Sequence, residues 1–193
     1  MALDFVEVKV HMVPYEGNIG HMYLDTKGLV TVGIGNYLPS VEAAQALGFV
    51  SRASTRSASA AEIKADYESV EKQRLGLRAQ GYREFTKLDL PDLAINDLFR
   101  KRVDEFKKQL KGSYPSFDDY PPAAQLAMLD MAFNLGTSGL KRKWPNLNAA
   151  IDKKDWADAA ANCTRPDANA VRNTRTIELF KRAAEQAAVV VKK

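Results

Sequence analysis

One run of apolar residues constrains the fold of this chain more than any other feature of its sequence. Nearly every residue between Ala123 and Leu135 is apolar, and Gly136 follows as a stop signal. A helix that is apolar on all sides has to be surrounded by other elements. We therefore expect this segment to be the central helix of an α-helical lobe.

Other helices are predicted on both sides of this central segment. At Asp89-Leu90-Pro91-Asp92 an N-cap candidate precedes a proline, and an apolar stripe then continues to about Gly112. The three prolines of 113–122 indicate a loop. The remaining helical patterns cover about 91–111, 146–153, 154–162 and 170–191.

The N-terminal part has a different pattern. From Tyr23 to Gly35, β-branched alternation flanks the turn residues Lys27-Gly28, which predicts a β-hairpin. The Ser/Ala/Arg-rich residues 51–59 indicate an exposed loop, and 60–77 a charged helix. The first fifteen residues fit both a strand and a helix, so their structure stays open.

Composition bounds the class of protein. The chain has 193 residues, 46% of them hydrophobic and 27% charged, which suits one soluble globular domain. No membrane span and no Sec-type signal peptide are predicted, because charged residues interrupt every apolar run. With one cysteine and two scattered histidines, we expect no disulfide, no metal site and no cofactor.

The charge balance favours an anionic partner without selecting one. The formal net charge is +4 and the isoelectric point is about 9.1. Nucleic acid, anionic lipid and the carboxylate-bearing bacterial wall would all satisfy such a mild excess.

Three residues around the predicted hairpin could carry chemistry. Glu16 lies before it, Asp25 on its first strand or turn, and Thr31 on its second strand. Hydrolysis of a glycosidic bond needs one carboxyl that keeps its proton and one that stays ionised, and a hydroxyl can help to position the water. From spacing alone, however, the two acids can equally be solvated surface residues, Thr31 a strand former, and Gly33 a packing glycine.

A resemblance favours the catalytic interpretation. The segment resembles the catalytic region of the phage-type lysozymes, the glycoside hydrolase family that includes T-even phage endolysins and pesticin-like toxins. The matching residues are Glu16-Gly17, Met22-Tyr23-Leu24-Asp25-Thr26, Gly28, Thr31 and Val32-Gly33-Ile34-Gly35. The resemblance implies that Glu16 is the general acid, that Asp25 and Thr31 hold the attacking water, and that Gly33 supports the site. The family usually inverts the anomeric centre.

Later segments resemble the same family. Residues 127–136 resemble its buried helix, and 156–160 a later one. Arg172, Arg175, Ile177 and Phe180 are similar to its Arg-rich C-terminal motif, in which the first Arg helps to fix the catalytic Glu. Arg172 is therefore a supporting-site candidate. Asn134 is a second candidate, either as a hydrogen-bonding partner of the sugar or as a helix cap.

Three features depart from the family pattern. Pro14 is expected to interrupt the helix that normally carries the acid. Asn36 stands where the family often has His, and the segment 37–88 is longer than the family needs.

Together these patterns predict an α+β, mainly helical, lysozyme-like fold. We expect a single domain over 1–193 with a β-containing lobe at about 15–88, a linking helix at about 91–111 and a helical lobe at about 112–193, with the cleft between the lobes. The predicted function is that of a muramidase, a lysozyme that cuts the β-1,4 bond between N-acetylmuramic acid and N-acetylglucosamine.

The alternatives are a catalytically silent peptidoglycan-binding module and, ranked last, a nonspecific nucleic-acid binder. The expected partner is peptidoglycan, with an immunity protein in addition if the chain is an antibacterial effector; no nucleic-acid partner is expected, and the chain is expected to be a monomer. We expect synthesis in the cytoplasm and action in the periplasm or wall of a host or target bacterium, in phage lysis or as a secreted toxin.

Overall fold

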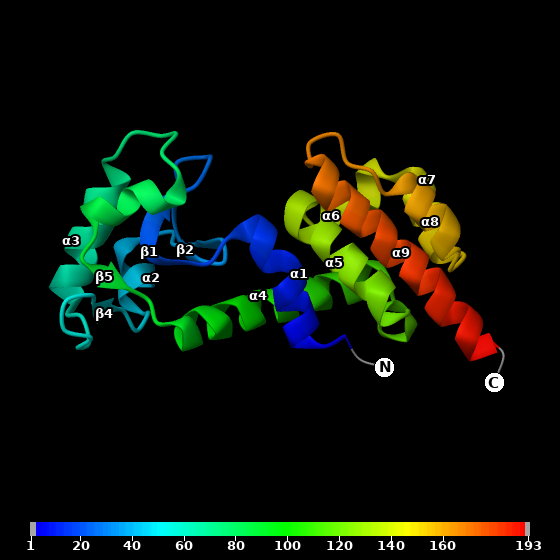
Figure 1. Cartoon of the computed structure of the whole chain (residues 1–193), viewed down its shortest axis with the longest axis horizontal. Coiled ribbons are helices and arrows are strands. Elements are labelled where there is room, and N and C mark those ends of the chain that lie inside the picture. The colour runs from blue at the N-terminus through cyan, green and yellow to red at the C-terminus, as the bar shows by residue number, and fades with distance from the viewer. Residues whose placement is uncertain (1–2, 192–193) are drawn as a thin grey trace. The chain divides into compact units, whose positions relative to one another are not determined.

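The computed structural model describes residues 3–191 and shows an α+β, mainly helical protein with small antiparallel sheets (Figure 1). The chain divides into two compact units, one made of 13–101 and the other of 1–12 with 102–193. Helices α1 (Phe5–Glu16) and α4 (Asp92–Ser113) each contain residues of both units.

A three-stranded antiparallel sheet organises the first unit, 13–101. It has the order β1-β2-β3, with strands Ile19–Leu24, Val30–Gly33 and Asn36–Tyr37. The predicted hairpin is therefore confirmed, and Thr31 pairs with Tyr23 on one side and Tyr37 on the other. Helix α3 (Ala60–Glu71) packs against β1 and β2, and the Tyr67 hydroxyl donates to the Leu38 carbonyl at 3.2 Å.

The long segment between this sheet and α4 is folded. Its elements are α2 (Val41–Gln45), β4 (Val50–Ser51), the 3-10 helix η1 (Ala79–Phe85) and β5 (Leu88–Asp89), besides α3. Strands β4 and β5 pair antiparallel. The exposed loop predicted at 51–59 is largely confirmed, although Ser51 belongs to β4.

Helices fill the second unit. Helix α5 (Pro122–Leu135) is at its centre, and its residues 123–132 are all buried, as the apolar run predicts. The C-terminal helix α9 (Ala170–Val191) packs against both α5 and α8 (Trp156–Asn162). The elements around α5 are η2 (Phe117–Asp119), α6 (Thr137–Lys143), α7 (Pro145–Asp152), α8 (Trp156–Asn162) and α9 (Ala170–Val191).

Three local predictions are wrong. Pro14 does not interrupt its helix, since it lies inside α1 in the last turn, where its missing N–H removes one hydrogen bond at Val10, a residue that is 70% exposed. The helix predicted over 60–77 ends at Glu71, before Gly76, whose φ is +91°. Asp89 is not an N-cap, because it belongs to β5 and pairs with Arg52 at 3.0 Å.

His21 on β1 makes the stability of the first unit depend on pH. It is 1% exposed, and its Nε2 donates to the Ala79 carbonyl at 2.9 Å, which leaves Nδ1 as a buried acceptor without a partner among the described residues. Burial lowers the pKa of His21 below its ordinary value of 6.5. The unfolded chain therefore takes up a proton near pH 6.5 while the folded chain does not, and stability is lost as the pH falls below that value.

We expect the free energy of unfolding to fall less steeply between pH 7 and 5.5 in a His21→Gln variant than in the parent. Urea unfolding followed by circular dichroism at several pH values measures both slopes. Equal slopes in the two proteins would contradict this assignment, whatever the variant's stability at pH 7.

Candidate functional site

Glu16 is placed by the end of a helix. It is the last residue of α1, and Gly17 follows with a φ of +76° while its N–H donates to the Val13 carbonyl at 2.9 Å. A left-handed glycine is the common way to end a helix, so the Glu16-Gly17 pair fixes where the helix stops. The Glu16 side chain is half-buried.

Asp25 lies in the turn that joins β1 to β2. Its Oδ1 accepts hydrogen bonds from the backbone N–H of Lys27 at 2.8 Å and of Leu29 at 2.9 Å. Its own N–H donates to the Leu29 carbonyl at 3.0 Å. These bonds fix the carboxylate, and its other oxygen, Oδ2, makes no hydrogen bond to the described part of the chain. Oδ2 is therefore the oxygen that could accept from a ligand or a water.

Thr31 is joined to Asp25 through a single residue. The Thr31 hydroxyl donates to the Leu29 carbonyl at 2.9 Å, while the N–H of the same Leu29 donates to Asp25. Because the hydroxyl hydrogen is engaged, Oγ1 can offer only its lone pairs to a further partner. The hairpin thus links Asp25 and Thr31 through Leu29, and the Thr31 residue is itself buried, at 3% exposed.

Glu16 and Asp25 lie at opposite ends of one strand. Glu16 precedes β1 and Asp25 follows it, and the register of β1 with β2 shifts between Ile19 and Tyr23. An irregularity of this kind bends a strand and increases its twist. Strand β1, which separates the two residues, is therefore irregular between Ile19 and Tyr23.

Gly33 has a structural reason to be glycine. Its φ is +67°, and a Cβ at this position would lie 3.1 Å from Cγ2 of Ile95. A side chain here meets both backbone strain and a tight contact, which explains the residue without any role in substrate binding.

We expect Gly33→Ala to destabilise the first unit by roughly 1–2 kcal/mol, because the left-handed conformation costs about that much for a residue with a Cβ. Gly48→Ala is the matched control, since a Cβ there would have no atom within 4 Å and the φ of Gly48 is not positive. Urea unfolding compares the two variants. Equal losses in both would refute the proposed strain at Gly33.

The other two predicted site residues belong to the helical unit. Asn134 is exposed near the end of α5. Arg172 is only 8% exposed on α9, and its Nε donates to Asp130 Oδ1 at 2.9 Å. Arg172 is thus part of a buried ionic network, a role that the sequence patterns did not predict.

Asp130 is the centre of this network. Its side chain is fully buried and accepts from Arg165 Nη2 at 2.8 Å, and the Thr176 hydroxyl lies 3.1 Å from the same oxygen. His11 Nε2 lies 3.8 Å from Oδ1. Burial raises the pKa of the Asp130 carboxyl, but the contact with His11 and the charges of Arg172 and Arg165 outweigh it, so the pKa lies well below its usual range. A single charged residue inside the apolar run was the available sequence signal for this network.

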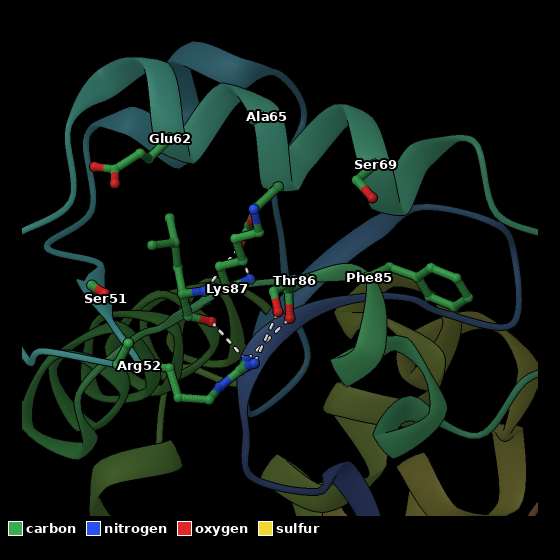
Figure 2. A pocket seen from close by; sticks show the side chains of 11 residues that line it. Ser51, Arg52, Glu62, Ala65, Ser69, Phe85, Thr86 and Lys87 are labelled. Carbon is green, nitrogen blue, oxygen red and sulfur yellow. Dashed lines mark hydrogen bonds between the residues drawn. The ribbon is translucent and has the colours of Figure 1, made fainter.

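The sequence patterns also did not predict a pocket of about 690 Å³ in the first unit, between α3 and the segment 85–88 (Figure 2). Four charged residues line it, namely Arg52, Glu62, Asp66 and Lys87. Its lining residues all belong to the segment 37–88, which is longer than the resemblance to the phage-type lysozymes would require.

No protein-family model matches the chain, and no curated protein matches its sequence. Among residues 3–191, none of the helices has both the length and the apolar character that crossing a bilayer requires. Within the same residues, no cluster of three or more His, Cys, Asp or Glu side chains is arranged to hold a metal ion.

Proposed function

We propose that the chain is a muramidase with a lysozyme-like fold of the phage type, which hydrolyses the β-1,4 bond between N-acetylmuramic acid and N-acetylglucosamine. The observation that carries the proposal is the arrangement around Leu29, where one backbone residue joins the Asp25 carboxylate to the Thr31 hydroxyl. Glu16, half-buried at the end of α1, supplies the second carboxyl.

The two acceptors suit the activation of a water molecule. A water that donates one proton to Asp25 Oδ2 and the other to Thr31 Oγ1 has a lone pair left for the anomeric carbon. As it attacks, the water transfers a proton to Asp25, and Glu16 protonates the leaving oxygen. Afterwards Asp25 releases its proton to solvent and Glu16 takes one up, which restores both groups.

Glu16 is the proposed proton donor, half-buried as the last residue of α1. Inversion at the anomeric carbon requires room for a water between the two carboxyls, so we expect the Glu16 and Asp25 carboxyls to be about 6.5–9.5 Å apart when substrate is bound.

The proposed setting is the bacterial wall, reached from a phage-infected cell or by delivery into a competitor. The net charge of +4 is compatible with the anionic wall. If the chain is an antibacterial effector, an immunity protein that covers the site should copurify with it from its native host.

Anomer-resolved analysis of the products tests this proposal. Purified protein is incubated with a peptidoglycan oligosaccharide, and nuclear magnetic resonance records the anomer that forms first. We expect new reducing ends on N-acetylmuramic acid, initially in the α configuration. Binding to peptidoglycan without any soluble fragment would overturn the enzymatic proposal in favour of a silent binding module, and initial β product would overturn the inverting mechanism.

A further inference from the structure

The charged residues of the pocket between α3 and the segment 85–88 differ in whether other groups of the protein already bind their charges. Arg52 is engaged, since its guanidinium donates to Asp89, to the Thr86 carbonyl at 2.8 Å and to the Leu88 carbonyl at 3.2 Å (Figure 2). Glu62 is engaged as well, because it accepts from Arg56 at 3.0 Å and from the Ser59 N–H at 2.9 Å. Neither has its charge available for a ligand.

Asp66 is buried and only half engaged. It is 6% exposed, and its Oδ2 accepts from the backbone N–H groups of Lys87 at 2.8 Å and Leu88 at 2.9 Å. Its Oδ1 makes no hydrogen bond within residues 3–191, although this side chain lines the pocket. Oδ1 is therefore the carboxylate oxygen that can accept a hydrogen bond from a ligand or a water in the pocket.

Lys87 provides the opposite charge. In Figure 2 its side chain points toward α3 and into the pocket. Across the described residues its ammonium group has no ion pair within 4.0 Å, and this includes Asp66. The pocket therefore presents one anionic group and one exposed cationic group that form no direct ion pair with each other.

We propose that this pocket binds a zwitterionic amino-acid end, whose ammonium group donates to Asp66 Oδ1 and whose carboxylate pairs with Lys87. A simple cation would be repelled by Lys87 and a simple anion by Asp66, whereas a ligand with both charges on one carbon satisfies the two residues together. Phe85 and Ala65, which also line the pocket, offer an apolar wall for the attached carbon chain. The volume of about 690 Å³ is typical of small-ligand sites.

Two sources could present this chemistry, a free amino acid or the stem peptide of the wall. The second rests on the proposed function, because Gram-negative stem peptides contain diaminopimelate, a residue with an amine and a carboxylate on its free end. The pocket would then hold the peptide of a strand whose glycan is the substrate.

Isothermal titration calorimetry on the full chain tests the proposal with three ligands. They are meso-diaminopimelate, N-acetylmuramyl-L-Ala-D-Glu-meso-diaminopimelate, and the same muropeptide with its free amine acetylated. None contains the bond that a muramidase cuts, so the result does not depend on the proposed activity. If meso-diaminopimelate and the unmodified muropeptide bind equally well, the pocket is a site for a free amino acid. If only the unmodified muropeptide binds, the ligand is the stem peptide of the wall.

Acetylation of the amine, Asp66→Asn and Lys87→Gln should each weaken binding about tenfold or more, as expected for loss of a charged hydrogen bond. Asp66→Asn keeps a side-chain oxygen that can accept from the backbone N–H groups of Lys87 and Leu88. If Asp66→Asn is nevertheless unstable, Lys87→Gln still tests the pocket, because it leaves these backbone hydrogen bonds in place. Lys64→Gln is the matched control, because Lys64 pairs with Glu68 at 3.6 Å and does not line the pocket. Absence of binding, or equal affinity of the acetylated muropeptide or of the Lys87→Gln variant, would overturn the proposal.

Discussion

A Glu16→Gln variant should cut peptidoglycan at least about a hundredfold more slowly than the parent, because general acid catalysis contributes a factor of this size or more. Glutamine keeps the shape of the side chain but has no acidic proton to transfer to the leaving oxygen. Release of muropeptides, measured by mass spectrometry over time, gives the two rates. The effect should appear in the rate of cleavage and not in binding to insoluble peptidoglycan.

Glu84→Gln is the matched control for this experiment. Glu84 is an exposed residue of η1 in the same unit and should tolerate the change with its rate unaltered within about twofold. Both variants should show the thermal unfolding of the parent. Should Glu16→Gln retain most of the parent's rate, another group must protonate the leaving oxygen and the assignment of Glu16 is lost.

The parts of the site that the sequence predicts are those built from neighbouring residues. The hairpin follows from β-branched alternation and a turn glycine, and each bond that joins Asp25, Leu29 and Thr31 spans at most four positions. Helix α5 was predictable for a similar reason, since its apolar residues decide its burial without reference to any partner.

What escaped the sequence depends on contacts between distant residues. Arg52 meets Asp89 across 37 positions, and Asp130 meets Arg172 across 42. No periodicity records such pairs. The short elements α2, β4 and α6 were missed because tertiary contacts stabilise them more than local propensity does. At Pro14 a strong local preference was misleading. The proline predicts a break in the helix, but α1 continues through it, because only one hydrogen bond is lost there.

The buried network around Asp130 carries the largest expected change in stability. Asp130→Asn removes the carboxylate that pairs with both Arg165 and Arg172, whose side chains are 0% and 10% exposed. The two buried guanidinium groups would then lose the counter-charge that they share. Breaking a buried ionic group in this way costs about 3–5 kcal/mol, so we expect a loss of this size at pH 7.

Tryptophan fluorescence during urea unfolding measures this loss in the helical unit alone, because both tryptophans of the chain, Trp144 and Trp156, belong to it. The matched control is Asp118→Asn, whose carboxylate is 65% exposed and pairs with Lys111 at 2.7 Å. An exposed pair contributes at most about 1 kcal/mol, so this variant should remain close to the parent.

The pH dependence gives the Asp130 prediction a second readout. In the folded chain the carboxyl pKa lies well below its ordinary value of 3.8, so the network's contribution is present above about pH 4 and is lost as the pH falls below it. The difference in stability between the parent and Asp130→Asn should therefore shrink on acidification. A difference that stays constant from pH 7 to pH 3, or a variant as stable as the Asp118→Asn control, would show that the Asp130 charge does not hold this core together.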